Sequence, residues 1–227
     1  MSISLIIPAA GVGKRFSSNI KKQFTEIDSK PLIYWTIKRL ITAYKFDELI
    51  VGINQDDIKF MDKVMADLHL NIPHIYAEGG KERANTVLNC LLKSTCDFAA
   101  VHDSVRPFVS SQVVKDTILK AYKTNAAICG LPVRDTVKKL EGSTIEKTVS
   151  RDNLFLAHTP QVFRKDLILN ALTHSLDNNI IVTDEASACE YSNIHVDTVL
   201  SNYENIKVTY TEDVHLIQLF KTKFFEV

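Results

Sequence analysis

The first stretch of the chain whose residue types suit phosphate chemistry is a turn of small residues followed by basic side chains, Pro8-Ala9-Ala10-Gly11-Val12-Gly13-Lys14-Arg15-Phe16. It follows an apolar run that is predicted to be the first strand. Small residues at the carboxyl end of such a strand let backbone N–H groups approach a phosphate or a base edge. Lys21 and Lys22 follow shortly after and could meet the phosphates of a nucleoside triphosphate. An ordinary strand-to-helix connection with solvated basic residues would also account for this stretch taken alone.

Two familiar phosphate-binding motifs do not fit this turn. A Walker A loop needs Ser or Thr after its lysine, whereas Arg15 follows Lys14, and the earlier glycine of that motif falls on Pro8. The dinucleotide fingerprint needs a third small residue where Phe16 stands. These mismatches count against an ATPase loop and against an NAD-dependent dehydrogenase.

A carboxylate with possible ligand chemistry stands further along the chain. Asp103 follows the apolar run 98–102, at the carboxyl end of a predicted strand, where open α/β sheets place ligand contacts. It could bind a sugar hydroxyl or Mg²⁺, and Arg106 could pair with it or with substrate. The seven histidines lack metal-ligand spacing, and nothing resembles a zinc site or a Ser-His-Asp triad.

Short apolar runs alternate with helical periodicity along most of the chain. Strands are predicted at 2–7, 48–53, 74–76, 98–102 and 126–131. Helical stripes are predicted after Pro31 and over 58–68, 87–92 and 114–121. This alternation predicts an α/β fold with a mostly parallel sheet that helices cover on both faces.

Two segments depart from this rhythm. Residues 134–151 alternate with period two and contain Gly142, which predicts an inserted β-ribbon arm that turns near Glu141-Gly142 and packs on a second subunit. The stretch 211–224 predicts a closing helix with Thr211 as its N-cap. Without repeats or a linker, residues 1–227 are expected to form a single domain with this arm.

The bulk composition excludes several classes of protein. Lys plus Arg and Asp plus Glu number 27 each, which argues against a bulk attraction to nucleic acid or to an anionic membrane. No apolar run approaches the length of a membrane span, and the N-terminus does not read as a signal peptide. Four cysteines without C-x-x-C spacing are expected to be reduced core residues. We expect a cytoplasmic protein.

Seven sequence blocks in order resemble one enzyme family, that of the 2-C-methyl-D-erythritol 4-phosphate cytidylyltransferases, within the sugar-nucleotide pyrophosphorylases. The first is Ile6-Ile7-Pro8-Ala9-Ala10-Gly11-x-Gly13-x-Arg15 with Lys22-Gln23-Phe24. The others are Gly79-Gly80-x-x-Arg83-x-x-Thr86-Val87, His102-Asp103-x-x-Arg106-Pro107, Pro132-Val133-x-Asp135-Thr136, Thr159-Pro160-Gln161, Thr183-Asp184-Glu185-Ala186-Ser187 and Asn205-Ile206-Lys207-Val208-Thr209. The resemblance implies a Rossmann-like, GT-A-like nucleotidyltransferase fold and a reaction that joins CMP from CTP to a polyol phosphate in isoprenoid precursor synthesis.

The resemblance also implies roles around the nucleotide. Arg15 and Lys22 would stabilise the charge that develops on the α-phosphate, and Lys14 would help to hold the triphosphate. The remaining CTP contacts would come from backbone groups and one hydroxyl, at Pro8, Ala9, Ala10, Gly11, Gly13, Gly80 and Thr86. Mg²⁺ would be held largely by the phosphates and water, with Asp103 as a possible metal contact.

The acceptor side is implied in the same way. Arg151 and Lys207 would position the attacking phosphate, with Lys207 inside a predicted strand at 206–209. Asp103 and Arg106 would contact the methylerythritol chain. Thr136 would act in the neighbouring active site of a homodimer.

Two departures and two rivals accompany the resemblance. Lys21 stands where the family usually has Pro, and Lys81 stands where acidic residues often follow Gly79-Gly80. The nearest rival is a ribitol-5-phosphate cytidylyltransferase, which the 183–187 block disfavours. A nucleotide-binding module without catalysis is the other, and the retained basic residues argue against it.

Overall fold

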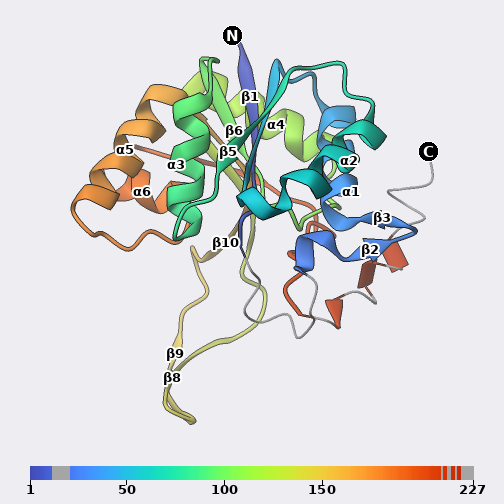
Figure 1. Cartoon of the computed structure of the whole chain (residues 1–227). Coiled ribbons are helices and arrows are strands. Elements are labelled where there is room, and N and C mark those ends of the chain that lie inside the picture. Colours follow the sequence, from blue (N-terminus) through green and yellow to red (C-terminus); the bar gives the residue numbers. More distant parts are fainter. Residues whose placement is uncertain (12–20, 211, 214–215, 218, 221–227) are drawn as a thin grey trace.

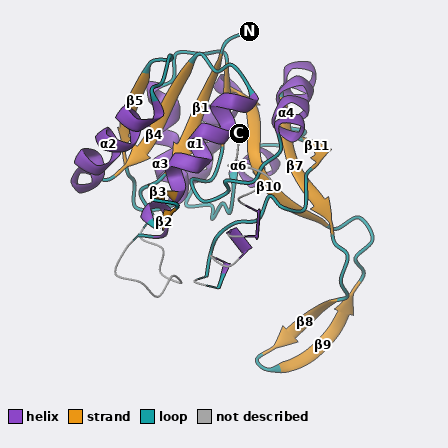
Figure 2. Ribbon diagram, turned by 90° about the vertical axis from the view of Figure 1, so that its right-hand side faces the viewer, coloured by secondary structure: helices purple, strands orange, loops and turns teal. Residues whose placement is uncertain are grey.

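The computed structural model describes residues 1–11, 21–210, 212–213, 216–217 and 219–220. Its centre is a seven-stranded sheet with the strand order β11-β7-β10-β6-β1-β4-β5 (Figures 1 and 2). The strands are β1 (Ile3–Pro8), β4 (Glu48–Ile53), β5 (His74–Glu78), β6 (Phe98–Val101), β7 (Ala126–Pro132), β10 (Phe155–Arg164) and β11 (Asp197–Leu200). Strand β10 runs antiparallel to both of its neighbours, β6 and β7, and the other pairs in this sheet are parallel.

The central strands are apolar on both faces because each face of the sheet is covered by helices. Leu5 and Ile7 of β1 pack into one core with helices α1, α2 and α4, whereas Ile6 packs into another core with α3, α5 and α6. This arrangement confirms the predicted α/β class with a mostly parallel sheet. The helices are α1 (Leu32–Ala43), α2 (Ile58–Leu68), α3 (Arg83–Lys93), α4 (Ser111–Thr124), α5 (Lys165–Asp177) and α6 (Glu185–Tyr191).

Sequence-coded caps fix where several helices begin. The Ser110 hydroxyl accepts a hydrogen bond from the Val113 amide at the start of α4. Asp184 does the same for the Ser187 amide at the start of α6, and the Ser187 side chain completes a capping box. The cap at α6 sets the direction of Glu185, the first residue of that helix.

Smaller elements follow the first turn. They are the 3₁₀ helices η1 (Lys22–Phe24) and η2 (Gln55–Asp57) and the strand pair β2 (Glu26–Ile27) and β3 (Lys30–Pro31). Phe24 of η1 packs on Phe60 of α2 with ring centroids 4.6 Å apart. Lys21 forms an ion pair with Asp57 at 2.5 Å. The segment after the turn is therefore attached to the η2–α2 segment.

The predicted ribbon is present as a two-stranded arm that projects from the body (Figure 2). It consists of β8 (Val137–Glu141) and β9 (Thr144–Val149), and it turns at Gly142, whose φ of +59° favours glycine. Leu140 and Ile145 are 56% and 58% exposed, so the arm has little packing of its own against the body.

The sequence located most core elements to within a few residues. The strand predicted at 48–53 matches β4, and the helix predicted at 58–68 matches α2. The first strand was predicted at 2–7 and is shifted by one residue in the structure. Strands β10 and β11 were not predicted. The predicted closing helix is helical at the described positions 213, 216–217 and 219–220, whereas its N-cap Thr211 lies outside the described residues.

Two expectations from composition concern the described part of the chain. All four cysteines are free and buried, as predicted for core residues. Within the described ranges, none of the helices combines the length and apolarity that crossing a bilayer requires.

Candidate active site

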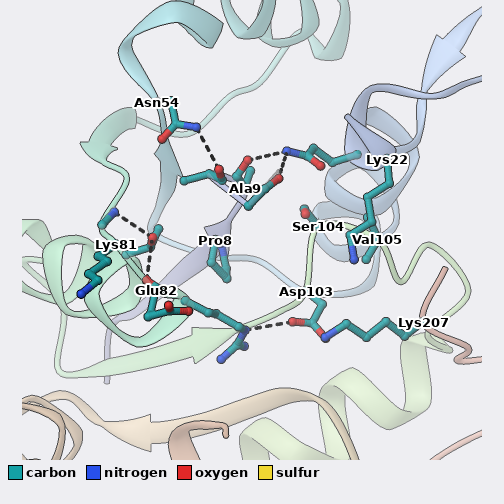
Figure 3. A pocket seen from close by; sticks show the side chains of 16 residues that line it. Pro8, Ala9, Lys22, Asn54, Lys81, Glu82, Asp103, Ser104, Val105 and Lys207 are labelled. Atoms are coloured by element: carbon teal, nitrogen blue, oxygen red, sulfur yellow. Dashed lines mark hydrogen bonds and ion pairs between the residues drawn. The ribbon is translucent and has the colours of Figure 1, made fainter. Parts of the chain in front are cut away.

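The carboxyl ends of β1, β4, β5 and β6 meet at one edge of the sheet because these strands are parallel. A cavity of about 420 Å³ lies at that edge (Figure 3). It is lined by the residues that follow each of these strands, together with one lysine from η1 and one from the C-terminal segment. The lining includes Pro8, Ala9, Ala10, Gly11, Lys22, Gln23, Asn54, Gly80, Lys81, Glu82, Arg83, Thr86, Asp103 and Lys207. This is where open α/β sheets bind ligands.

The small-residue turn packs tightly against the segment after β5. A Cβ atom on Gly79 would lie 2.4 Å from the Ala10 Cβ and 2.5 Å from the Asn54 Oδ1 atom. Only a glycine at position 79 lets these two backbones approach so closely. Figure 3 shows the Asn54 side chain directed at the turn, where its Nδ2 donates to the Ala10 carbonyl at 2.8 Å.

The next contact fixes the loop between β5 and α3. The Gly80 amide donates to the Thr86 hydroxyl at 3.0 Å. That hydroxyl in turn donates to the Glu82 carbonyl at 3.3 Å. These bonds hold Gly80 and Thr86 beside the cavity. Their contacts with CTP stay a prediction.

Asp103 is the centre of a buried charge cluster on the floor of the cavity. Its Oδ1 atom accepts from the Arg83 Nε at 3.2 Å. Its Oδ2 atom lies 3.2 Å from the Arg106 Nε and 2.9 Å from the Lys207 Nζ. The predicted pairing of Arg106 with Asp103 is therefore present, with two further cations around the same carboxylate.

Glu185 extends this cluster to the second core. Its carboxylate is 1% exposed and accepts two hydrogen bonds from the Arg83 guanidinium, at 2.6 and 3.1 Å. Arg83 thus bridges two carboxylates, one that follows β6 and one at the start of α6. Such a two-pronged pair fixes the guanidinium plane as well as its position.

The electrostatic consequences are strongest at the two buried groups after β6. Burial alone would raise the pKa of Asp103, but Arg83, Lys207 and Arg106 outweigh it and hold that pKa well below its ordinary value. Burial lowers the pKa of His102 to about 4, against a hydrogen bond to the Arg106 carbonyl that favours the charged form. Asp103 is therefore ionised and His102 neutral at pH 7.

Lys207 reaches Asp103 because its chain neighbours are buried. The Val208 side chain is 1% exposed, and the Val208 amide donates to the Val105 carbonyl at 3.0 Å. The Asn205 carbonyl accepts from Arg106 at 2.7 Å. The predicted strand at 206–209 is wrong: in the described chain this segment belongs to no sheet, and the burial of Val208 and its bond to Val105 position it instead.

A second hollow of about 250 Å³ adjoins the first cavity. It shares Arg83, Asp103 and Lys207 with that cavity and adds residues of β10 and of the loop before α6. Burial lowers the pKa of His158, one of these β10 residues, to about 4. Two adjoining spaces on either side of one lysine suit a reaction between two substrates.

The structure brings together most of the predicted site residues. Those that line the two spaces are Pro8, Ala9, Ala10, Gly11, Lys22, Gly80, Thr86, Asp103, Arg106 and Lys207. Thr136 and Arg151 lie at the base of the arm and line neither space, and an Arg151 guanidinium nitrogen donates to the Arg134 carbonyl. Gly13, Lys14 and Arg15 lie outside the described residues.

Four residues of this site were given no role by sequence reasoning. Arg83, Glu185 and Gln23 lie inside the sequence blocks quoted above. The resemblance therefore pointed to these positions, but it did not indicate which groups their side chains contact. Asn54 carried no signal except its place directly after a strand that is buried throughout.

The donor set does not fit a protein-held Mg²⁺ at Asp103. Both carboxylate oxygens already face cations, so a divalent ion there would add to three positive charges. The described residues also contain no group of three or more acidic, histidine or cysteine side chains arranged to hold a metal.

A mostly parallel sheet with a small-residue turn and fixed cations at the carboxyl ends of its strands is the arrangement of a nucleotide-binding α/β protein. The family model described as IspD, 2-C-methyl-D-erythritol 4-phosphate cytidylyltransferase, matches residues 3–223. The chain belongs to that family. The predicted resemblance is thereby confirmed.

Individual relatives agree with this assignment along nearly the whole chain. A 2-C-methyl-D-erythritol 4-phosphate cytidylyltransferase from Acinetobacter baylyi is 39% identical over 223 residues, which cover 94% of this chain and 91% of the relative. One from Bacillus cereus is 36% identical over 218 residues, which cover 96% of each. The crystal structure of the Francisella tularensis enzyme has a TM-score of 0.82 at 30% identity, covering 96% of this chain and 99% of that one.

Proposed function

We propose that this protein transfers CMP from CTP to 2-C-methyl-D-erythritol 4-phosphate and releases pyrophosphate. The observation that carries the proposal is the cavity that joins the small-residue turn to Lys22 and Lys207, in a chain of the IspD family. Ribitol 5-phosphate as acceptor and a module without catalysis are not favoured, since the family model and the relatives named above specify methylerythritol phosphate.

The reaction makes one P–O bond and breaks another. An oxygen of the acceptor phosphate attacks the α-phosphorus of CTP, and the bond to the pyrophosphate oxygen breaks. Negative charge develops around the α-phosphorus, so positioned cations are the main requirement. Lys22 lies at the turn and suits this role, together with Arg15 by family resemblance.

Lys207 suits the acceptor phosphate because Asp103 holds its ammonium group at the boundary between the two spaces. The ion pair is 2.9 Å long and the lysine side chain is 37% exposed, so the ammonium keeps a face open to a ligand. Holding the nucleophile in line lowers the barrier without any proton transfer by the protein.

The decisive experiment measures pyrophosphate release with 2-C-methyl-D-erythritol 4-phosphate and each of CTP, UTP, ATP and GTP. We expect CTP to be used in clear preference. A parallel assay with ribitol 5-phosphate tests the acceptor, and faster turnover of that polyol would overturn the assignment.

Lys22→Ala tests the role of the turn lysine. We expect kcat to fall by about a hundredfold or more, because a fixed cation at a developing charge contributes several kcal/mol, with a much smaller change in the Kd for CTP. Steady-state kinetics and a CTP titration check this. Equal losses in both quantities would mean that Lys22 only binds the nucleotide.

The proposal includes a homodimer in which the arm carries Thr136 to the partner's site. The exposed arm and the position of Thr136 and Arg151 away from both spaces support it. Mixing inactive Lys22→Ala and Thr136→Ala proteins tests it, because one of the two sites in a mixed dimer then contains neither defect. Recovery of activity on mixing is expected, and no recovery from mixtures shown to exchange subunits would contradict it.

Mg²⁺ and a cytoplasmic location complete the proposal. The ion is proposed as a companion of the triphosphate, since Mg²⁺ keeps its waters and binds phosphates readily. Loss of turnover with a chelator, restored by added Mg²⁺, is the expected result. Four free, buried cysteines suit a reducing compartment.

A further inference from the structure

Two side-chain amides hold three consecutive carbonyl groups of the small-residue turn. The Gln23 Nε2 atom donates to the Ala9 carbonyl at 2.7 Å and to the Gly11 carbonyl at 3.0 Å. The Asn54 Nδ2 atom donates to the Ala10 carbonyl between them at 2.8 Å. Figure 3 shows these bonds as dashed lines above the cavity.

The direction of these carbonyls determines the direction of the neighbouring amides. In a trans peptide the C=O of one residue and the N–H of the next point in opposite directions. The Ala10 N–H therefore points away from Gln23, and the Gly11 N–H points away from Asn54. Among the residues that the structure describes, neither N–H has a hydrogen-bond partner, whereas the Ala9 N–H bonds to the Gly52 carbonyl at 2.7 Å.

The two amides belong to segments that support each other. Gln23 is 1% exposed and lies in η1, between Lys21, which pairs with Asp57, and Phe24, which packs on Phe60. Asn54 directly precedes η2, the helix that contains Asp57. A shift of either segment would therefore move both amides, and the turn carbonyls with them.

We propose that Gln23 and Asn54 are positioning residues for the nucleotide, which fix the peptide planes of the turn so that the Ala10 and Gly11 amides are presented to CTP. The inference rests on the proposed function, because it takes CTP as the ligand of this cavity. In this proposal the ligand contacts backbone N–H groups, and two neutral side chains hold those groups in the required direction.

The test replaces each amide by the carboxylate of the same shape, in Gln23→Glu and Asn54→Asp. A carboxylate cannot donate, and it repels the carbonyl oxygens that the amide held. We expect the Kd for CTP to rise about tenfold in each variant, which corresponds to about 1.4 kcal/mol. The KM for the acceptor should stay within about twofold, since Lys207 and Asp103 are untouched.

Asn89→Asp is the matched control. Asn89 also donates from its side-chain amide to a backbone carbonyl, that of Glu78 at 2.9 Å, but it does not line the cavity. Its variant should bind CTP as the wild type does. Thermal unfolding of all three variants reports whether each is folded, and Asn54 is only half-buried, so its variant keeps the test open if Gln23→Glu does not fold.

CTP affinity unchanged in the folded variants would overturn the inference, and so would an equal rise in the KM of both substrates. Titration with CTP also separates this inference from the proposed function. A wild-type protein that binds CTP but releases no pyrophosphate would contradict the proposed function and leave the affinity comparison intact.

Discussion

The two halves of the site are built from different interactions. The turn that we propose faces the nucleotide is oriented by neutral amides, Gln23 and Asn54, and by the close approach of Gly79. The floor that adjoins the second space is oriented by charges, with Asp103 among three cations and Glu185 behind Arg83. One half depends on shape and hydrogen bonds, and the other on balanced charge.

This difference has a physical reason. A triphosphate brings its own negative charge, so N–H groups held by neutral side chains can direct it beside the lysines that balance that charge. In the other half, the buried carboxylate of Asp103 offsets the three cations around it, which would otherwise repel one another. We therefore expect mutations in the charged half to cost more folding stability, and mutations in the neutral half to act mainly on CTP affinity.

Asp103→Asn should have the largest effect on stability. The variant leaves Arg83, Arg106 and Lys207 without their common carboxylate, which in buried clusters costs about 4 kcal/mol of unfolding free energy. Urea denaturation measures the loss. Asp166→Asn, which removes a pair with Arg164 that is about half exposed on both sides, should cost under about 1 kcal/mol, and equal losses in the two variants would contradict the contrast.

The buried, neutral His102 beside the charged half should make the free energy of unfolding depend on pH. An unfolded chain takes up a proton at this histidine below its ordinary pKa of 6.5, whereas burial keeps the folded form neutral down to about pH 4. His102 should therefore contribute a loss of about 3 kcal/mol of stability as the pH drops across this window. Asp103 does not contribute there, because its lowered pKa keeps the folded carboxylate ionised and its stabilisation is lost only below about pH 4.

Denaturation curves at several pH values check this expectation with two variants. His102→Asn should make the slope between pH 6.5 and 4 shallower, and the part that remains includes His158, whose pKa burial also lowers to about 4. His195→Asn, at an exposed position, should leave the slope as in the wild type. A slope as steep in His102→Asn as in the wild type would contradict the contribution of His102.

Gly79→Ala should cost about 2 kcal/mol, because the added methyl group overlaps Ala10 and Asn54. It should also weaken CTP binding by displacing the turn. Among the described residues, none lies within 4 Å of a Cβ added at Gly11, so Gly11→Ala should unfold at nearly the wild-type denaturant concentration. Equal destabilisation of the two variants would mean that the close approach of Gly79 is not what constrains the turn.

Lys21→Pro should have the smallest effect. Lys21 has φ of −60°, which proline shares, and the substitution restores the residue that the family usually has at this position. The rigid ring should offset the loss of the ion pair with Asp57, for a net change under about 1 kcal/mol. A loss of several kcal/mol in urea denaturation would show that the ion pair is indispensable to the turn.

Elements buried on both faces could be predicted well from the sequence. Strands β1 and β4 are continuous apolar runs because helices cover both sides of each, and that pattern is visible without a structure. Strand β10 was missed because its first half is little buried and because Pro160 interrupts it. Strand β11 is only four residues long and alternates in burial, which is a weak signal.

The site was predictable in its residue types but not in its contacts. Asp103 and Lys207 were both identified, yet nothing in a separation of more than a hundred residues reveals an ion pair. The amide of Gln23 was visible beside Lys22, but its two carbonyl acceptors depend on how η1 folds back on the turn. Sequence spacing indicates which residues lie at the ends of strands. Which of these residues contact one another depends on how the elements pack around the sheet.

The position of Lys207 late in the chain also has a consequence for biosynthesis. A polypeptide is made from its N-terminus, so β1, β4, β5 and β6 can pair long before residue 207 exists. The nascent protein would then present the nucleotide half of the site while Asp103 still lacks its lysine. The second half is completed only when the segment around Val208 docks on Val105, so transfer activity requires that synthesis has passed this segment.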